Sequence, residues 1–186
     1  MKILAVQSRM GIGDTVIFLP FIKALSKKFN SPISILVKEN SKANQYLHQT
    51  KYIDKILILE RDNKTNNRHG GFFGIFKLAN DLKKYKFDKI FIFNSSLRFN
   101  LVAKISSIPQ IYQYPLFAKN KQHIIEAPKK FLKKNLDLDI NEDPEVQIDS
   151  DLISKAAQKF QIDKNTTNIL LGIGGSGPTK RIPAKT

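Results

Sequence analysis

The chain has 186 residues, of which 41% are hydrophobic and 25% charged, a composition that predicts one complete globular core with a remainder. No apolar run approaches the ~20 residues of a membrane-spanning helix, and polar residues interrupt the N-terminus too early for a signal peptide, so a cytoplasmic protein is expected. The absence of cysteine excludes disulfides and thiol catalysis, and three widely spaced histidines predict no metal site. The net charge of +15 favours an anionic partner: nucleic acid, an anionic lipid or a phosphorylated glycolipid.

The first stretch of the chain predicts a strand, a tight loop and a helix. The strand covers residues 3–6, the loop covers 7–13, and the helix is expected to begin near Asp14. Gly11 and Gly13 let the backbone turn sharply and bring a ligand close to the free N–H groups of the helix, which is the geometry of a phosphate site. In this chain a carboxylate, that of Asp14, stands at this position.

The elements that follow alternate between helices and strands, the pattern of a parallel α/β sheet. Runs of β-branched residues predict the strands, and capping or amphipathic patterns predict the helices. In chain order we expect a helix ending near 29–30, a strand over 33–37, a short helix capped by Ser41 and running to about Gln49, a strand over 56–59, a polar loop over 61–71, a helix over 72–85 and a strand over 90–93.

The helix predicted over 72–85 is amphipathic, with a core face expected to contain Phe72, Ile75, Phe76, Ala79 and Leu82. Phe73 lies off that face. Burial in the core is its preferred interpretation, and an exposed anchor for an apolar partner is the alternative.

The strand predicted over 90–93 is apolar at every position, which is typical of a central parallel strand covered on both faces. Ligands on such sheets bind beyond the carboxyl ends of the strands, where the loops after Val6, Val37 and Phe93 should meet. Arg98 follows the last of these loops and either holds an anionic substrate group or is simply solvated. Both interpretations stay open.

The second half of the chain continues the alternation and then changes character. The predicted elements are a strand over 108–112, a basic helix over 121–135 whose lysine pairs solvate its outer face, a short strand or extended crossing piece over 146–148, a helix over 151–160, a hydrophilic linker over 163–167, a buried strand over 168–173 and a glycine-rich loop over 174–181. A strand with a glycine loop therefore occurs twice. We predict an N-terminal Rossmann-like domain over 1–162 and, over 163–186, the start of a second, truncated one.

A dinucleotide-binding fingerprint is one interpretation of the N-terminal loop, with Gly11 and Gly13 as its first glycines and Glu39 as the ribose ligand. Val16 stands in place of the third glycine and crowds the helix against the strand, and Asp14 puts a negative charge where the pyrophosphate must sit. Both features disfavour a bound dinucleotide. The P-loop pattern GxxxxGKS or GxxxxGKT is also absent.

Asp14 is better explained as a catalytic carboxylate at the start of a helix. Such a group accepts a proton from a hydroxyl as that oxygen attacks, which suits transfer of an activated group to an alcohol. The alternative role is a helix cap, worth roughly 1 kcal/mol.

The segment GIGDTVIFLPFIKAL, residues 11–25, resembles the start of the heptosyltransferases of lipopolysaccharide synthesis, glycosyltransferase family 9. That family begins with a strand, a short loop ending in Leu-Gly-Asp or Ile-Gly-Asp, and a helix with a proline before Leu or Phe, the place of Pro20 here. The resemblance continues through residues 52–55 and 86–88, through His123 in the basic helix, and through the closing GIGGSGPTKRIP. In the closing segment Lys180 and Pro183 match, Ile182 replaces the usual tryptophan, and Asn94-Ser95-Ser96 earlier replaces a more common Gln-Gly pair.

The resemblance implies a GT-B fold, with a Rossmann-like parallel sheet and flanking helices in the N-terminal domain. It implies inverting transfer of a heptose from ADP-heptose to an inner-core sugar of lipopolysaccharide, with no cofactor and no required metal. Asp14 would be the general base on the acceptor hydroxyl, and Lys180 would meet the donor diphosphate beside Ser176 and the amides of Gly174 and Gly175. The residues expected to bind substrate are Gly11, Gly13, Ser96, Arg98 and His123.

The expected partners are therefore a nucleotide-sugar donor, ADP-heptose, and an inner-core lipopolysaccharide acceptor. An anionic membrane surface at the inner face of the inner membrane agrees with the charge, and nucleic acid is not expected. With most of the donor site missing, these 186 residues should be inactive alone. The alternative function is a non-catalytic α/β module that binds a nucleotide or a polyanion.

Overall fold

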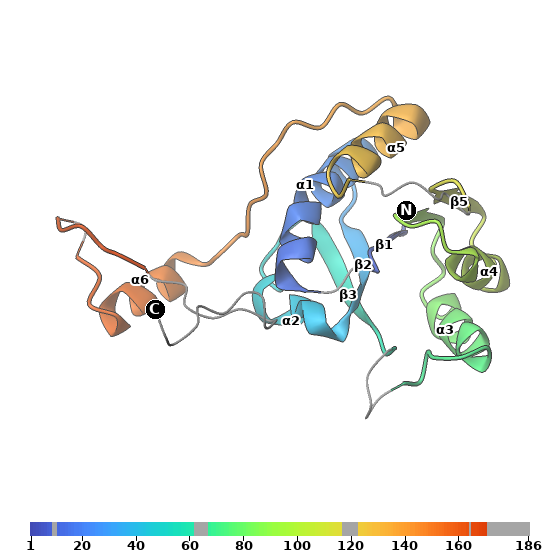
Figure 1. The fold of residues 1–186 in the computed structure, drawn as a ribbon, viewed down its shortest axis with the longest axis horizontal. Helices are drawn as coiled ribbons and strands as arrows, with labels where there is room; N and C mark the ends of the chain where they lie inside the picture. Colours follow the sequence, from blue (N-terminus) through green and yellow to red (C-terminus); the bar gives the residue numbers. More distant parts are fainter. Residues whose placement is uncertain (9–10, 62–66, 117–122, 164, 171–186) are drawn as a thin grey trace, which may run out of the picture. The chain divides into compact units, whose positions relative to one another are not determined.

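The computed structural model of the chain describes residues 1–8, 11–61, 67–116, 123–163 and 165–170 (Figure 1). It divides into two units, Met1–Ile148 and Asp149–Thr186. The first unit contains the sheet and both hydrophobic clusters of the described residues. No helix in the described ranges has the length and apolar character needed to cross a membrane.

The first unit is built on a five-stranded sheet with the order β3-β2-β1-β4-β5. The strands pair in parallel throughout this sheet, so every strand presents its carboxyl end at the same edge. The strands are β1 Ile3–Val6, β2 Ile33–Lys38, β3 Ile53–Leu59, β4 Lys89–Ile92 and β5 Gln110–Gln113. The prediction of an interior fourth strand is confirmed, because Ile90, Phe91 and Ile92 are fully buried between β1 and β5.

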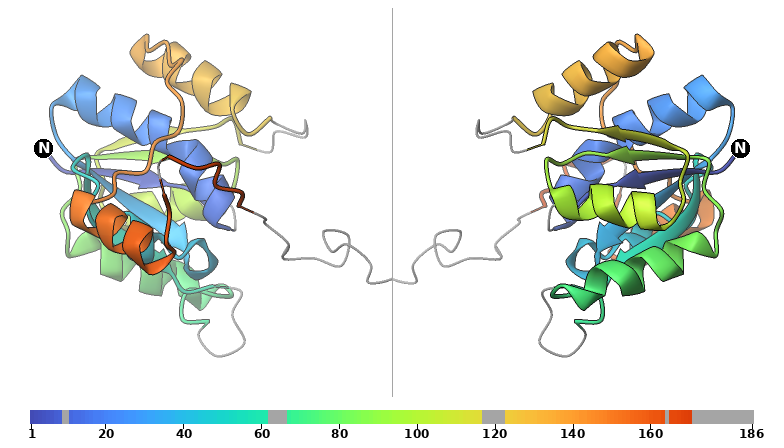
Figure 2. Two further views of the ribbon diagram at one scale, coloured as in Figure 1. Left: turned by 90° about the vertical axis from the view of Figure 1, so that its left-hand side faces the viewer. Right: turned by 90° about the vertical axis from the view of Figure 1, so that its right-hand side faces the viewer.

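Helices cover both faces of this sheet (Figure 2). Alternating side chains of each strand point to opposite faces, so Ile3 and Ala5 join one cluster while Leu4 and Val6 join the other. The first cluster is closed by α1 Ile12–Phe29 and α5 Glu126–Leu136, and the second by α3 Phe73–Lys83 and α4 Leu97–Ile105. The alternation of strands and helices in the sequence therefore predicts the layers correctly.

The region after β2 differs from the expected helix of 41–49. It contains a 3-10 turn, η1 Glu39–Ser41, and a single turn of helix, α2 Ala43–Tyr46. Lys42 between them has a left-handed backbone with φ 49, which interrupts a continuous helix. The Ser41 hydroxyl still acts locally, since it accepts a hydrogen bond from the Ala43 N–H at 3.4 Å.

The segment after α5 crosses the outside of α1 without forming the strand considered for 146–148. Glu142 pairs with Lys23 at 3.0 Å and with Lys27 at 2.5 Å on α1. The Gln147 Oε1 atom then accepts a hydrogen bond from the Lys51 N–H at 2.9 Å, close to the start of β3. The segment is held by its side chains and so needs no strand pairing.

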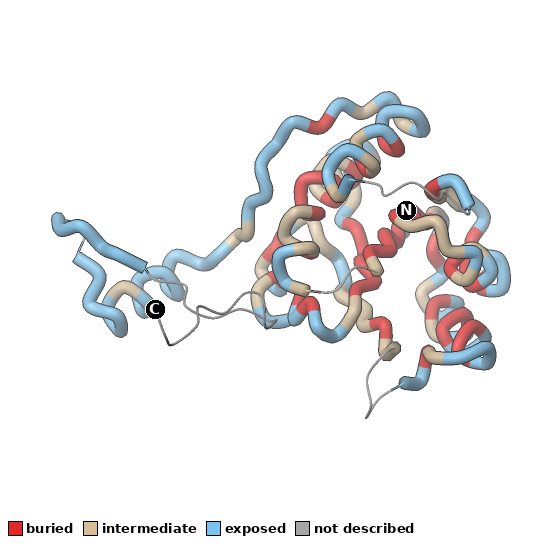
Figure 3. Tube along the Cα trace, viewed as in Figure 1, coloured by how far each residue is buried: buried red, intermediate tan, exposed pale blue. Residues whose placement is uncertain are grey.

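The face that α3 turns to the core also differs from the prediction (Figure 3). The buried positions are Gly74, Ile75, Leu78, Ala79 and Leu82. Gly74 lies so close to the His69 backbone that the helix must present this side inward. The stripe is therefore centred on Leu78, and the expectation that Phe72, Phe73 and Phe76 are core residues is wrong: they are 69%, 76% and 45% exposed.

The described part of the second unit consists of α6 Ser150–Lys159 and the residues after it. Asp149 caps this helix, because its side chain accepts a hydrogen bond from the Asp151 N–H at 2.8 Å. The predicted helix over 151–160 is thus confirmed. The predicted glycine loop, with Gly174, Gly175, Ser176 and Lys180, lies outside the described residues, and the domain boundary at 162/163 stays a prediction.

Candidate functional site

The carboxyl edge of the sheet gathers the loops that follow the strands. Gln7 continues β1, Glu39 follows β2, Asn94 follows β4 and Tyr114 follows β5. On parallel sheets this edge is where ligands bind, because helix N-termini and free loop backbone converge there. Most of the site residues predicted from the first 162 positions lie on these loops or at the start of the helices that follow them.

The loop after β4 is tied to both neighbouring strands by side-chain amides. Asn94 Nδ2 donates to Ser8 Oγ at 3.2 Å, and Asn94 Oδ1 accepts from the Ser96 N–H at 2.9 Å. Gln113 Nε2 donates to the carbonyls of Asn94 and Ser96 at 3.1 and 2.9 Å. Asn100 in turn donates to Gln113 Oε1 at 2.9 Å. This network holds Ser96 in place through hydrogen bonds to its backbone N–H and carbonyl groups. The Ser96 hydroxyl has no hydrogen-bond partner within the described residues.

Asp14 lies in the first turn of α1 and is partly buried. The helix begins at Ile12, before the expected start, and Gly11 is its N-cap with φ 109, a conformation that favours glycine. The N-cap is Gly11 rather than Asp14, and within the described residues no side chain makes a capping hydrogen bond to this helix, so the alternative role of Asp14 as a cap is wrong. In the part of the chain that the structure describes, no group hydrogen-bonds to its carboxylate or pairs with it. The carboxylate is therefore available to a ligand at the edge of the sheet.

Gln7 lies beneath the start of α1 and is buried, with 4% of its surface exposed. Its Nε2 atom donates to the Asp14 carbonyl at 3.4 Å, and its backbone N–H extends the sheet by bonding the Leu36 carbonyl at 3.0 Å. Its Oε1 atom is buried and has no hydrogen-bond partner among the residues that the structure describes. Gln7 therefore anchors the start of α1 to the end of β1.

Arg98 makes contacts that neither open interpretation includes. One guanidinium nitrogen donates to the Gly71 carbonyl at 2.7 Å, and the other donates to the His69 carbonyl. A Cβ atom added to Gly74 would lie 2.9 Å from that second nitrogen. The arginine joins the start of α4 to the segment before α3, and its binding of a substrate anion stays a prediction.

A buried histidine, which the sequence does not single out, supports the same segment. His69 is 4% exposed; its Nδ1 atom accepts from the Glu60 N–H at 3.1 Å, and its Nε2 atom lies 3.1 Å from an Asp81 carboxylate oxygen. Burial raises the pKa of Asp81, but hydrogen bonds from His69, Arg68 and Lys84 outweigh it, so the pKa lies below its ordinary value. This cluster is structural because it ties the end of β3 to α3.

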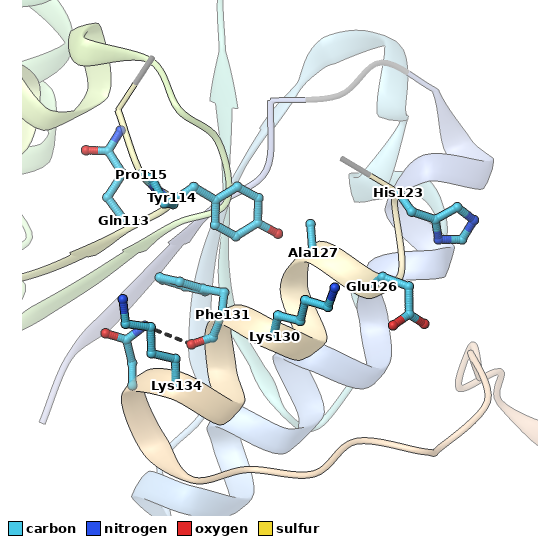
Figure 4. A pocket seen from close by; sticks show the side chains of 10 residues that line it. Gln113, Tyr114, Pro115, His123, Glu126, Ala127, Lys130, Phe131 and Lys134 are labelled. Carbon is cyan, nitrogen blue, oxygen red and sulfur yellow. Dashed lines mark hydrogen bonds between the residues drawn. The ribbon is translucent and has the colours of Figure 1, made fainter. Parts of the chain in front are cut away.

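A cavity of about 830 Å³ lies between the end of β5 and α5 (Figure 4). Tyr114 and Phe131 form its aromatic part, with their ring centroids 5.0 Å apart. Lys130 and Lys134 lie one helical turn apart on its α5 side. Neither lysine has an ion-pair partner within the described residues. This volume and this mixture of apolar and cationic groups suit an anionic ligand the size of a sugar.

His123 lines the same cavity but does not lie in a helix as expected. It precedes α5, and its carbonyl accepts a hydrogen bond from the Ala127 N–H at 3.1 Å, so it belongs to the entry of the helix. Lys130 and Lys134 are exposed, as expected for lysines that solvate the outer face of the helix, and they also border this cavity. In the sequence, the only sign that Lys130 and Lys134 border one cavity is their spacing of one helical turn in a helix that also contains Phe131.

The structure therefore brings Gly11, Gly13, Asp14 and Ser96 to one edge of the sheet, where β5 also leads into the cavity that contains His123. It turns Arg98 toward loop carbonyls. No cluster within the described ranges has the composition of a metal site.

No protein-family model matches the sequence, and no curated protein matches it. Solved structures do match. A glycosyl transferase of family 9 from Veillonella parvula aligns with a TM-score of 0.73 and 18% identity, over 98% of this chain and 56% of that one. E. coli ADP-heptose LPS heptosyltransferase II aligns with a TM-score of 0.58 and 16% identity, over 88% of this chain and 52% of that one. E. coli heptosyltransferase WaaC with ADP-2-deoxy-2-fluoro heptose aligns with a TM-score of 0.50 and 12% identity, over 76% and 50%.

The chain thus spans about half the length of the solved structures that it matches. Identities this low show a shared fold. The expected fold class, an α/β parallel sheet with flanking helices of the GT-B type, is confirmed. The predicted resemblance is confirmed at the same level: the chain has the fold of a family 9 glycosyltransferase over about half of that protein's length.

Proposed function

We propose that this chain is the acceptor-binding part of an inverting glycosyltransferase that moves a heptose from ADP-heptose to an inner-core sugar of lipopolysaccharide. A fold hosts many functions, so the fold match alone does not carry the proposal. The observation that carries it is the Asp14 carboxylate, which has no partner within the described residues and lies at the ligand-binding edge of this fold.

In the proposed reaction, a hydroxyl oxygen of the acceptor attacks the anomeric carbon of the donor. The Asp14 carboxylate accepts the hydroxyl proton as the new C–O bond forms. The bond between the anomeric carbon and the diphosphate oxygen breaks, and ADP leaves with that electron pair. Attack from the face opposite the leaving group inverts the anomeric centre, and no metal is required by these steps.

The donor diphosphate is assigned to the second glycine loop. Lys180 would neutralise charge as ADP leaves, with Ser176 and the amides of Gly174 and Gly175 donating hydrogen bonds. Residues 163–186 would then begin a donor-binding domain.

The acceptor is assigned to the edge that contains Asp14, Ser96 and the cavity beside α5. Lys130 and Lys134 could hold the anionic groups of a phosphate-bearing acceptor while Tyr114 and Phe131 contact its sugar ring. A lipopolysaccharide acceptor also agrees with a peripheral location at the inner face of the inner membrane.

The second candidate function is a non-catalytic module that binds a nucleotide or a polyanion. Lys130 and Lys134, which have no ion-pair partner within the described residues, favour it together with the +15 charge. The two candidates predict different ligands and a different salt dependence of binding. The affinity of a protein for nucleic acid falls steeply with salt when the binding is driven by contacts to phosphates.

Calorimetric titration of the 186-residue chain with deacylated inner-core oligosaccharide and with single-stranded DNA separates them. Our proposal predicts oligosaccharide binding that survives ~200 mM salt and weakens about tenfold in Lys130→Gln/Lys134→Gln. The control Lys51→Gln/Lys55→Gln carries the same charge change on the far side of the sheet and should bind normally. DNA binding alone, with a steep salt dependence, would favour the polyanion module.

A further inference from the structure

The start of α3 exposes a cluster of aromatic rings that the core does not use. Phe72, Phe73 and Phe76 are 69%, 76% and 45% exposed. The rings contact one another, with Phe72 centroids 6.0 Å from Phe73 and 5.7 Å from Phe76. Three large apolar side chains gathered in solvent are costly for a soluble surface and indicate an interaction site.

The cluster continues onto α4, which packs beside α3. Arg98 joins the two helix starts by donating to the Gly71 carbonyl, and Leu97 precedes it at the start of α4. Leu97, Leu101 and Ile105 follow at successive turns of α4 and are 42%, 38% and 38% exposed. The apolar surface therefore spans both helices, and we call these six residues the α3–α4 apolar surface.

The charges around this surface are cationic. Lys77 follows Phe73 by one turn of α3, and Lys104 lies one turn after Leu101 on α4. Both are exposed, and neither has an ion-pair or hydrogen-bond partner for its ammonium group within the described residues. The carboxylate of α3, that of Asp81, is already held by Arg68, His69 and Lys84. Apolar rings flanked by unpaired lysines are complementary to an anionic lipid interface.

The position of the surface relates it to the proposed acceptor site. Both α3 and α4 begin at the carboxyl edge of the sheet, because they follow β3 and β4 of a parallel sheet. Asp14 lies at the same edge, in the first turn of α1. A bilayer contacted by Phe72 and Phe73 would therefore present headgroups toward the edge on which Asp14 lies.

We infer that the α3–α4 apolar surface docks this protein on a bilayer that contains anionic lipid, with Phe72 and Phe73 inserted at the interface and Lys77 and Lys104 on the headgroups. The inference rests on the proposed function only for which membrane is contacted, the inner face of the inner membrane. The docking itself needs neither donor nor acceptor.

Co-sedimentation with vesicles of phosphatidylcholine, and of phosphatidylcholine mixed with phosphatidylglycerol, tests it on the full 186-residue chain. The wild-type protein should bind the mixed vesicles, and Phe72→Ser/Phe73→Ser should lower the partition coefficient at least ~tenfold. Phe160→Ser removes a ring that is 68% exposed in the other unit and should leave partitioning unchanged. Equal binding by the wild-type protein and the double variant would overturn the inference.

A second pair of double variants tests how much the lysines contribute to vesicle binding. Lys77→Gln/Lys104→Gln should weaken partitioning about fivefold for each lysine, and Lys51→Gln/Lys55→Gln, with the same change in net charge, should weaken it far less. Equal losses in the two pairs would show that attraction is spread over the whole surface and would overturn the docking site.

The chain contains no tryptophan, so Phe73→Trp introduces a unique fluorophore into the surface without depending on loss of binding. Its emission should shift to the blue on mixed vesicles and be quenched by brominated lipid, whereas Phe160→Trp should do neither. Phe72-dependent dimers in sedimentation velocity without lipid, and no shift with vesicles, would assign the surface to a second copy of the chain instead. Retained binding of the soluble deacylated oligosaccharide in that case would leave the proposed function standing.

Discussion

Asp14 is the residue whose chemistry distinguishes this protein from a generic nucleotide-binding fold. Its carboxylate lies where a phosphate would otherwise bind, it does not cap its helix, and it has no partner among the described residues. A general base for a sugar hydroxyl needs this combination of access and position.

In a chain extended by a complete donor-binding domain, Asp14→Asn should lower kcat about 10²- to 10⁴-fold, because the proton of the attacking hydroxyl then has no acceptor. ADP binding should change little. Release of ADP in a coupled assay measures the first quantity and calorimetry the second. Asp151→Asn is the matched control, since it also removes a carboxylate from the first turn of a helix. Activity retained in Asp14→Asn would end its proposed role.

The lowered pKa of Asp81 makes the stability of the protein depend on pH. The pKa of Asp81 in the folded protein lies below the ordinary value of 3.8, so its contribution to stability is present above that value and is lost as the pH falls through the folded pKa. Asp81→Asn should reduce the free energy of unfolding by about 1–3 kcal/mol near neutral pH, because asparagine has no charge and a single acceptor oxygen, so His69 and Arg68 cannot both keep their hydrogen bonds.

Urea unfolding near neutral pH and below about pH 4 measures this difference, which should shrink in acid. Asp139→Asn removes a carboxylate whose partner, Lys133, is exposed, and it should cost less than about 1 kcal/mol. A cost for Asp81→Asn that is the same at both pH values would contradict the assignment.

At the scale of elements, the path of α3 depends on its closest approach to the preceding segment. Gly74 contacts the His69 backbone, and this approach turns the phenylalanines outward and Leu78 inward. The amphipathic pattern of 72–85 is compatible with more than one face, because the aromatic residues extend the apolar arc around the helix.

Gly74→Ala should destabilise the protein by roughly 1–3 kcal/mol, since the new methyl group would meet the His69 backbone and Arg98. Gly13→Ala is the control: a Cβ atom there meets nothing within 4 Å, and the better helix former should change stability by less than about 1 kcal/mol, in the stabilising direction. Thermal unfolding followed by circular dichroism compares the two. Equal effects would show that close packing at Gly74 is unimportant.

Sequence patterns predict an element correctly where the residues within that element are sufficient to specify it. The strand at 3–6, the helix from the glycine loop to Phe29 and the apolar strand at 90–93 are predicted by local runs and periodicity, and all are found. The helix expected at 41–49 fails because a left-handed Lys42 interrupts it. His123 is assigned to the cavity only once β5 and α5 are packed together.

At the scale of the whole molecule, the chain matches about half of each solved glycosyltransferase structure. The proposed reaction needs a donor and an acceptor held by two domains. The 186-residue chain should therefore bind the core oligosaccharide and release no ADP from ADP-heptose above background. Measurable turnover in a coupled ADP assay would contradict the division of roles, and a mixture with the separately produced donor domain is the positive control.

Local patterns in the sequence are sufficient to predict the parallel α/β architecture and the position of the Asp14 carboxylate at the carboxyl edge of the sheet, because hydrophobic periodicity, glycines and strand ends are local properties. Tertiary structure decided which face of α3 is buried, that His69 is a buried support, that Arg98 holds loop carbonyls and that Lys130 and Lys134 border a cavity. These outcomes depend on which distant elements come into contact, and burial is a property of that contact rather than of a residue and its neighbours in sequence.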